Sequence, residues 1–152
     1  MIRLATIADR QEIINLITDS WTHIDHQDYK IKELDLIKDY FLHQNFDEVL
    51  EQQQCYLIII ENKLLAFGAY DKTTNQITHL YVHHQYLNWH FAKKLLTLLE
   101  QAAIAAGFLE ISVNAYLTSV SFFQNNNYHA IKRHYYEWNN RKIITFFMKK
   151  YF

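Results

Sequence analysis

The sequence predicts one α/β domain of the α+β type, in which helical segments alternate with strands. The chain has 152 residues, enough for a single domain with a substantial core, and half of them are apolar. Some segments repeat apolar residues at helical spacing, whereas others are dense β-forming runs bounded by Asn or Asp. No linker, repeat or low-complexity tract divides them, so we expect a single domain over residues 1–152.

The N-terminal half is predicted to form a strand, two helices and a β-hairpin. A short apolar opening indicates the strand, and apolar residues three and four apart indicate the helices. Two β-forming runs flank Glu61-Asn62-Lys63, a triplet that suits a tight turn and therefore predicts the hairpin. Residues 21–31 show no clear period and are expected to form a loop or short helix. The regular elements are expected, in order, at 2–6, 9–20, 31–52 (with a break near Asn45), 55–61 and 64–70.

The C-terminal half is predicted to add a strand, a long helix, another strand, a short helix and a second hairpin. The long helix repeats apolar residues three and four apart, and Gly107 suits its C-cap. Three asparagines end the short helix, and Asn139-Asn140 turns the hairpin. These elements are expected, in order, at 77–83, 90–106, 109–115, 120–125, 129–137 and 143–149.

Composition and charge argue against several classes of partner and location. The 15 Lys and Arg nearly balance 16 Asp and Glu, so the net charge of -1 indicates neither nucleic acid nor an anionic membrane as partner. Cys55 is the single cysteine, which excludes an intrachain disulfide, and it is expected to be a small core residue. No apolar run approaches the roughly 20 residues of a membrane span, and the N-terminus reaches Asp9 and Arg10 too soon for a signal peptide. We therefore expect a cytoplasmic protein.

Glycine and proline are scarce. The chain has 2 Gly and no Pro, although average usage is about 7% and 5%. Turns are therefore expected to rely on Asn and Asp, the other residues that tolerate left-handed conformations. A glycine missing from a motif must also be weighed against this general bias.

Four segments, in the order of the predicted elements, resemble the GNAT acetyltransferases. Residues 77–86 read ITHLYVHHQY, which is similar to the fourth strand and exit loop of that family. Residues 114–124 read NAYLTSVSFFQ, which is similar to the family's later Asn-Ala motif. The opening IRLATIAD (2–9) and the ending ITFFMKK (144–150) resemble its first and last strands. The second half looks most like the YafP-type branch.

This resemblance implies a mixed, mostly antiparallel sheet that is flanked by helices and splayed between strands 4 and 5. It also implies that acetyl-CoA binds in the splay, with its pyrophosphate on the amides that begin the 90–106 helix, because a helix N-terminus favours anions. The family's glycine-containing loop falls on residues 87–92, LNWHFA, where only Ala92 fits the pattern. The cofactor-binding residues implied are Tyr81, Val82, Asn88, Trp89, His90, Phe91, Ala92, Asn114, Ser119 and Phe123.

Two interpretations of that loop stay open. In the first, the amides of residues 88–92 still hold a phosphate, since Asn88 can adopt a left-handed conformation and His90 can add a donor. In the second, Trp89 and His90 obstruct the cleft, and the segment is only a helix cap.

Acetyl transfer to an amine needs a base for the ammonium proton and an acid for the leaving thiolate. The resemblance places His79 where many GNAT members carry a Glu, so His79 is the candidate base; the alternative is a hydrogen-bonded strand histidine. The family's usual tyrosine acid falls on Phe123, which cannot donate a proton. Tyr116 is the candidate acid, with Tyr128 or unassisted departure of the thiolate as alternatives.

The acceptor is expected to be a small-molecule amine or a peptide. Its candidate contacts are Trp21, His23, His26, Tyr29, Tyr135 and Trp138. Family members often pair through edge strands, which would allow a homodimer. No metal site is expected, because His79 and His83 are about 13 Å apart along an extended strand and the chain has neither HExxH nor a cysteine pair. The two functions left open are an acetyl-CoA-dependent N-acetyltransferase and a catalytically inactive GNAT-fold binding protein.

Overall fold

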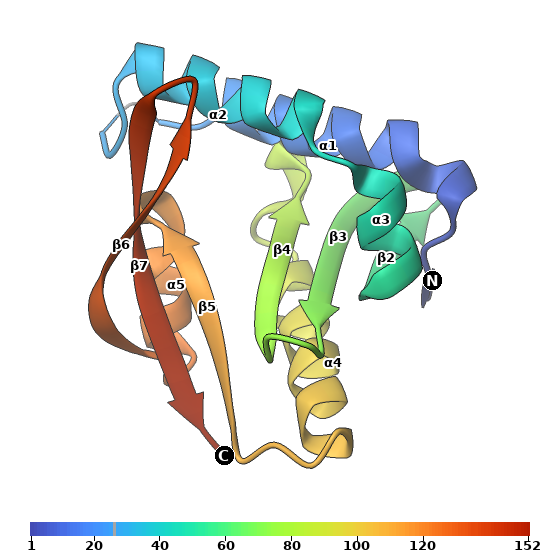
Figure 1. Ribbon diagram of the computed structural model, residues 1–152. Helices are drawn as coiled ribbons and strands as arrows, with labels where there is room; N and C mark the ends of the chain where they lie inside the picture. The colour runs from blue at the N-terminus through green and yellow to red at the C-terminus, as the bar shows by residue number, and fades with distance from the viewer. Residues whose placement is uncertain (26) are drawn as a thin grey trace.

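The computed structural model describes residues 1–25 and 27–152, which form a seven-stranded sheet in the order β1-β2-β3-β4-β5-β7-β6 (Figure 1). The strands are β1 Ile2–Leu4, β2 Gln54–Ile60, β3 Lys63–Asp71, β4 Gln76–Val82, β5 Glu110–Tyr116, β6 His129–Trp138 and β7 Arg141–Tyr151. The helices are α1 Arg10–Thr22, α2 Ile31–His43, α3 Phe46–Gln52, α4 Phe91–Ala105 and α5 Val120–Asn125. Single 3-10 turns occur at η1 Ile7–Asp9, η2 His84–Tyr86 and η3 Leu117–Ser119. This architecture confirms the predicted fold class and element order.

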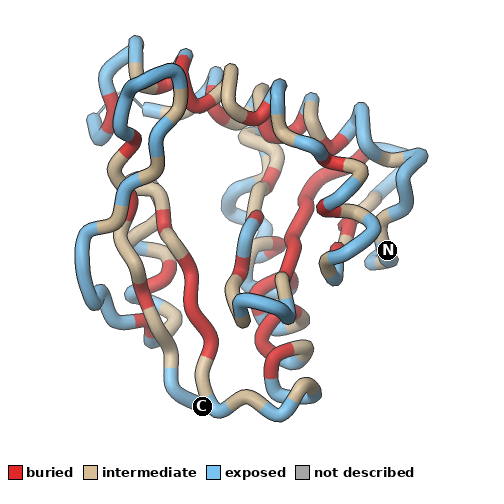
Figure 2. Tube along the Cα trace, in the orientation of Figure 1, coloured by how far each residue is buried: buried red, intermediate tan, exposed pale blue. Residues whose placement is uncertain are grey.

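The helices cover both faces of the sheet. One buried cluster joins α1, α2 and α3 to β2 and β3, and two others join α4 and α5 to the opposite face. Strand β3 lies between the two layers and is buried from Leu64 to Tyr70, as Figure 2 shows. At Gly68 an added Cβ would lie 3.3 Å from Leu99 Cδ1, so the small residue allows α4 to pack closely on β3.

The sheet separates between β4 and β5. Neighbouring strands are antiparallel except for this pair, which is parallel and is joined only at Gln76–Ser112 and Ile77–Val113. Beyond these residues the two strands diverge (Figure 1). A register shift opposite Ala69 and Tyr70 marks a β-bulge in β4 just where the divergence begins, and such bulges bend a strand and redirect its side chains. The bulge therefore contributes to opening the sheet at this point.

The turns use asparagine where glycine is usual. Positive φ angles occur at Gly107 and at seven other described residues, five of which are asparagines. These five are Asn62, Asn75, Asn127, Asn139 and Asn140. Gly107, with φ +91°, follows α4 as predicted, and its N–H bonds to Ile104 O at 2.9 Å. The prediction that asparagine replaces glycine in the turns is confirmed, because its side chain tolerates the left-handed region.

The main local difference from prediction is the end of α1. The helix runs to Thr22 instead of ending near residue 20, so Trp21 is helical rather than part of a loop. Trp21 lies one turn after Ile17 and continues the buried face of the helix. Among the described helices, none combines the length and the hydropathy that a bilayer crossing requires.

Candidate active site

A cavity of about 310 Å³ lies in the gap between β4 and β5. Its walls are β4 from Ile77 to Val82, the segment after it, the end of β5 with the turn that follows, and the end of α1 with the residues after it. The described residues that line it are apolar, aromatic, hydroxyl-bearing or amide side chains and histidines, with no Asp, Glu, Lys or Arg among them. Such a lining suits an uncharged group with a few oriented hydrogen bonds.

Asn114, on β5, carries an unpaired polar atom in this wall. Its Oδ1 is buried and is the one buried side-chain nitrogen or oxygen without a hydrogen-bond partner among the described residues. A buried carbonyl without a donor costs about 1–3 kcal/mol. A ligand N–H group in the cavity would satisfy this acceptor, so Asn114 is suited to orient an amide.

The backbone of β4 offers further donors. The N–H of His83 bonds to Leu65 O on β3 at 2.7 Å, and along an antiparallel strand successive residues pair on alternate sides. The same alternation pairs the backbone of Tyr81 with β3. The N–H groups of Leu80 and Val82 therefore point away from β3, toward the gap. Of the two β4 residues expected to bind the cofactor, only Val82 directs its amide there.

His79 belongs to the cavity lining but is almost fully enclosed by its neighbours. Its ring is 4% exposed and lies between the rings of Phe41 and Phe46, at centroid distances of 6.0 and 5.4 Å. Its Nδ1 lies 2.9 Å from Thr78 Oγ1, and its Nε2 lies 3.3 Å from Gln44 Oε1. Burial lowers the pKa of His79 to about 4. The imidazole is therefore neutral at physiological pH and is a weak base.

An aromatic cluster closes the cavity beneath α1. Trp21 donates from Nε1 to the Tyr81 hydroxyl at 3.2 Å, and its ring lies edge-on to Tyr116 at 4.8 Å and to Tyr29 at 6.1 Å. The hydroxyl of Tyr116 lies 2.7 Å from that of Tyr136. Burial raises the pKa of Tyr116 well above its usual value. This phenol therefore keeps its proton and can act as a hydrogen-bond donor.

The segment before α4 contains a left-handed residue, a conformation that glycine usually adopts, although it has no glycine. His90 is left-handed, with φ +59°, whereas Asn88 is not among the described residues with positive φ. Trp89 is 60% exposed and packs on Tyr86, and Phe91 is buried with the core beneath α4. Residues 88–92 do not belong to the described cavity lining. Trp89 therefore does not fill the gap between β4 and β5.

The turn after β5 brings Ser119 and Phe123 to the cavity wall. Ser119 donates from Oγ to Tyr116 O at 3.0 Å and makes no side-chain cap on α5. Tyr128, considered as an alternative acid, lies elsewhere and donates to Glu100 Oε2 at 2.8 Å. Of the two tyrosines considered, only Tyr116 lines the cavity.

The expected acceptor contacts separate into two groups. Trp21 and His23 line the cavity. Tyr135 is 52% exposed on β6, and Trp138 is bound through Nε1 to a carboxylate of α2; neither belongs to the described lining. His26 lies outside the described residues.

Sequence reasoning missed one cluster of titratable side chains. Asp19 of α1 and His23, the residue that follows α1, meet His84 of η2 at the cavity mouth, with one ligand atom from each within 4.8 Å of the others. Asp19 and His23 are brought together by the last turn of α1 and its C-cap, whereas the predicted helix ended near residue 20 and placed His23 in a loop. The contact with His84 arises only from the fold.

A comparison with known families decides what this fold is. A family model of the acetyltransferase (GNAT) domain matches residues 25–151. The chain belongs to the GNAT family. A search of curated proteins found no match.

Solved GNAT structures share the fold at low sequence identity. The GCN5-related N-acetyltransferase described as an aminotransferase, class-II, from Rhodopseudomonas palustris superposes with a TM-score of 0.89 and 21% identity, over 100% of this chain and 95% of that chain. The PaiA N-acetyltransferase from Thermoplasma acidophilum, solved with coenzyme A, has a TM-score of 0.80 and 18% identity, over 100% and 98%. YncA from Salmonella typhimurium, solved with acetyl-CoA, has a TM-score of 0.66 and 13% identity, over 99% and 92%.

Within the GNAT family this chain has two notable substitutions in its site. His90 stands in the loop where the resemblance places a glycine, and it keeps the left-handed backbone that glycine usually supplies. Phe123 stands where the resemblance places a tyrosine acid, and it is 3% exposed in the wall of the cavity. The GNAT fold is thus retained, while His90 and Phe123 differ from the glycine and the tyrosine that the resemblance leads one to expect.

Proposed function

We propose that this chain is an acetyl-CoA-dependent N-acetyltransferase that moves an acetyl group directly to the primary amine of a small molecule or peptide. The observation that carries the proposal is the unpaired Oδ1 of Asn114, buried in the wall of the cavity between β4 and β5. The pantetheine arm of acetyl-CoA contains amide N–H groups of the kind that this oxygen would accept. Support also comes from GNAT structures of the same fold that contain coenzyme A or acetyl-CoA.

The residues present fit the cofactor. Asn114 and the amides of Leu80 and Val82 would bind pantetheine, and the apolar wall at Phe123 would exclude water from the thioester. The N-terminus of α4 at residues 90–92 would bind the pyrophosphate through free backbone N–H groups. Acetyl-CoA supplies an activated acetyl group as a thioester.

Proton transfer is assigned differently from the sequence-based expectation. Tyr116 is proposed as the donor toward the departing sulfur, because it lines the cavity and its burial keeps the phenol protonated. His79 has a lowered pKa and two polar neighbours, so we assign it to positioning β4 against α2 rather than to general base catalysis. The amine would then lose its proton to water at the cavity mouth.

Kinetics of variants distinguish these roles. A general base typically contributes about 10²–10⁴-fold to the rate. We expect His79→Gln to keep kcat within about tenfold of wild type, whereas Tyr116→Phe lowers kcat and leaves the Kd for acetyl-CoA unchanged. A loss of 100-fold or more in His79→Gln, with the fold intact, would restore His79 as the base.

A catalytically inactive GNAT-fold binding protein is the second candidate. The absence of the family glycine at His90 and of the tyrosine at Phe123 favours it. Isothermal titration with acetyl-CoA separates the two, with desulfo-CoA and acetyl-pantetheine as controls. Micromolar binding that weakens in acetyl-pantetheine, which lacks the pyrophosphate, supports the enzyme. No binding at millimolar acetyl-CoA refutes it.

Membership of the YafP-type branch, a single domain over residues 1–152, a cytoplasmic location and a homodimer stay predictions. The acceptor class also stays a prediction, since the cavity lining suits several amines. A screen of amines and peptide N-termini against the acetyl-CoA-binding protein would test it.

A further inference from the structure

The cluster at the cavity mouth has the composition of a transition-metal site. Asp19 lies in the last turn of α1, His23 is the C-cap residue that follows the helix, and His84 begins η2 two residues after the end of β4. His23 Nδ1 lies 3.8 Å from Asp19 Oδ1, and His84 Nδ1 lies 3.9 Å from Asp19 Oδ2. Two imidazoles and a carboxylate are ligands that Zn²⁺ accepts, and three protein ligands leave a coordination position open.

The spacing is close to what an ion requires. Ligand atoms at about 2.0–2.2 Å from a tetrahedral Zn²⁺ are roughly 3.3–3.5 Å apart, whereas the two measured N···O distances are 3.8 and 3.9 Å. Asp19 and His23 are exposed and His84 is half-buried, so these side chains have room to rotate into a coordinating arrangement. The backbone carbonyl of Asp19 lies 2.9 Å from His23 Nδ1. Coordination through Nδ1, the nitrogen of the 3.8 Å distance, requires that this hydrogen bond be given up.

The two imidazole rings are stacked in this structure. The rings of His23 and His84 are 3.7 Å apart and parallel within 3°. A metal lies in the plane of each imidazole that it binds, so both rings must rotate out of the stack when they coordinate one ion. Binding would therefore rearrange the cavity mouth, since both histidines line it.

A second Asp–His pair on α2 shows what the third ligand adds. His43 Nδ1 lies 3.4 Å from Asp39 Oδ1 and 2.8 Å from Asp39 O, which repeats the geometry of the Asp19–His23 pair. The Asp39 carboxylate is already bound by Trp138 Nε1 at 2.7 Å and Asn139 Nδ2 at 3.2 Å. No third ligand gathers there among the described residues. The α2 pair is therefore a matched control within the same chain.

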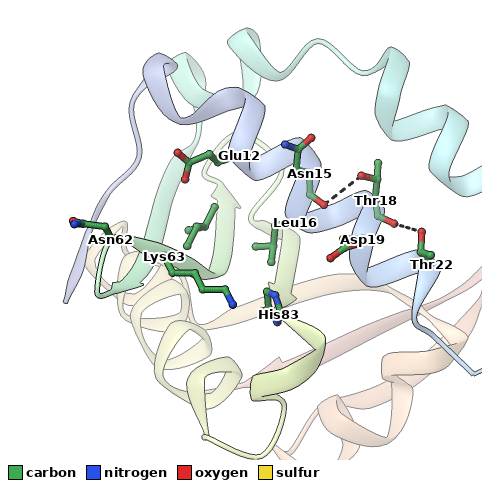
Figure 3. A pocket seen from close by; sticks show the side chains of 10 residues that line it. Glu12, Asn15, Leu16, Thr18, Asp19, Thr22, Asn62, Lys63 and His83 are labelled. Atoms are coloured by element: carbon green, nitrogen blue, oxygen red, sulfur yellow. Dashed lines mark hydrogen bonds between the residues drawn. The ribbon is translucent and has the colours of Figure 1, made fainter.

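The surroundings of the cluster suit an ion that connects two parts of the fold. Asp19 also borders a second hollow of about 570 Å³ between α1 and the β2–β3 turn. Figure 3 shows Asp19 on α1, with Lys63 and His83 across the hollow. The ring of His83 stacks on that of His84 at 4.6 Å, and His83 Nδ1 accepts from Gln85 N at 3.2 Å. The ring of His84 therefore packs against both His83 and His23.

We propose that Asp19, His23 and His84 bind a borderline divalent cation of the Zn²⁺ class and thereby link α1 to the segment after β4 across the mouth of the cavity. The proposal does not depend on the acetyltransferase assignment, because the cluster is formed by residues outside those assigned to acetyl-CoA. An open coordination position would remain for water or for a ligand atom entering the cavity.

The test is Zn²⁺ binding to the full-length, metal-free protein without acetyl-CoA, measured by competition with a chromophoric chelator. The variants are His84→Asn and His23→Asn, with His43→Asn as the matched control. Loss of even an outer-shell partner of a metal site costs about 10–100-fold in affinity, so each cluster variant should raise the Kd by about 100-fold or more. His43→Asn should leave the Kd unchanged.

Two further readouts make the outcome decisive. Circular dichroism and thermal melts of each metal-free variant establish that it is folded, and Zn²⁺ should raise the Tm of wild type and His43→Asn but not of His84→Asn. Co²⁺ in place of Zn²⁺ should give the visible absorption of a low-coordinate site in wild type but not in His84→Asn. Equal Zn²⁺ affinity in wild type and His84→Asn would overturn the proposal, as would an equal loss in His43→Asn.

Discussion

Replacing Asn114 by leucine tests whether its Oδ1 accepts a hydrogen bond from acetyl-CoA or instead stabilises the free protein. Asn114→Leu keeps a side chain of similar size and removes the buried Oδ1 that has no partner among the described residues. An unpaired buried carbonyl costs about 1–3 kcal/mol, so the free protein should gain about 1–2 kcal/mol in stability. For a domain of this size such a gain raises the Tm by roughly 2–8 °C.

The same substitution should weaken acetyl-CoA binding. One neutral hydrogen bond contributes about 0.5–1.5 kcal/mol net, which corresponds to a rise in Kd of roughly 2- to 13-fold. Thermal melts without ligand and isothermal titration with acetyl-CoA give the two quantities on the same samples. Stability and affinity should therefore change in opposite directions.

Asn75 provides the control. It accepts from the Tyr70 hydroxyl at 2.6 Å and donates to Glu110 O at 2.8 Å, and it does not belong to the described cavity lining. Asn75→Leu should destabilise the protein and leave the affinity unchanged. The reasoning is refuted if Asn114→Leu lowers the Tm and leaves the Kd for acetyl-CoA at the wild-type value.

Three further predictions concern the loop, the buried histidine and the C-terminal core. His90→Gly removes a left-handed strain of about 1–2 kcal/mol, which the backbone entropy of glycine partly offsets. The free energy of unfolding should therefore stay within about 1 kcal/mol of wild type, while isothermal titration should show tighter acetyl-CoA binding. Weaker binding would refute an anion site at this loop. The pKa of His79 is about 4 in the folded protein against 6.5 as its ordinary value, so the unfolded chain binds more protons in between and stability should fall by up to about 3 kcal/mol from pH 6.5 to 4. Urea unfolding should show a smaller fall in His79→Gln; an identical fall would contradict the assignment. Tyr128→Phe removes the donor to Glu100 Oε2 and should cost about 1.5–3 kcal/mol in urea unfolding, whereas Tyr151→Phe, at an exposed residue, should cost nothing.

The secondary structure was predictable because it depends on local patterns. The β-strands, the long α4 and the asparagine turns follow from the spacing of apolar residues and from turn chemistry, and their bounds differ from prediction by one or two residues. The gap between β4 and β5 was predicted through the family resemblance alone. Local patterns do not show how far two parallel strands stay paired.

The side-chain environments were not predictable in the same way. His79 is enclosed by Phe41 and Gln44, which come from α2 and the residue after it, so its burial and its weak basicity depend on tertiary packing. The contact of His23 with His84 joins segments about sixty residues apart. The sequence analysis named His23 as an acceptor contact but gave His84 no role, because nothing in the local pattern brings the two together.

The short seam between β4 and β5 has a consequence for the mechanics of the chain. Only two residue pairs hold these strands together, whereas every other pair of adjacent strands, apart from those of the short β1, is joined by six or more residue pairs. Beyond Ile77, the β4 amides that face β5 therefore have no partner strand, although they lie inside the sheet. A ligand that bonds to both strands would act as an extra strand, and it would couple the motions of the two halves of the protein.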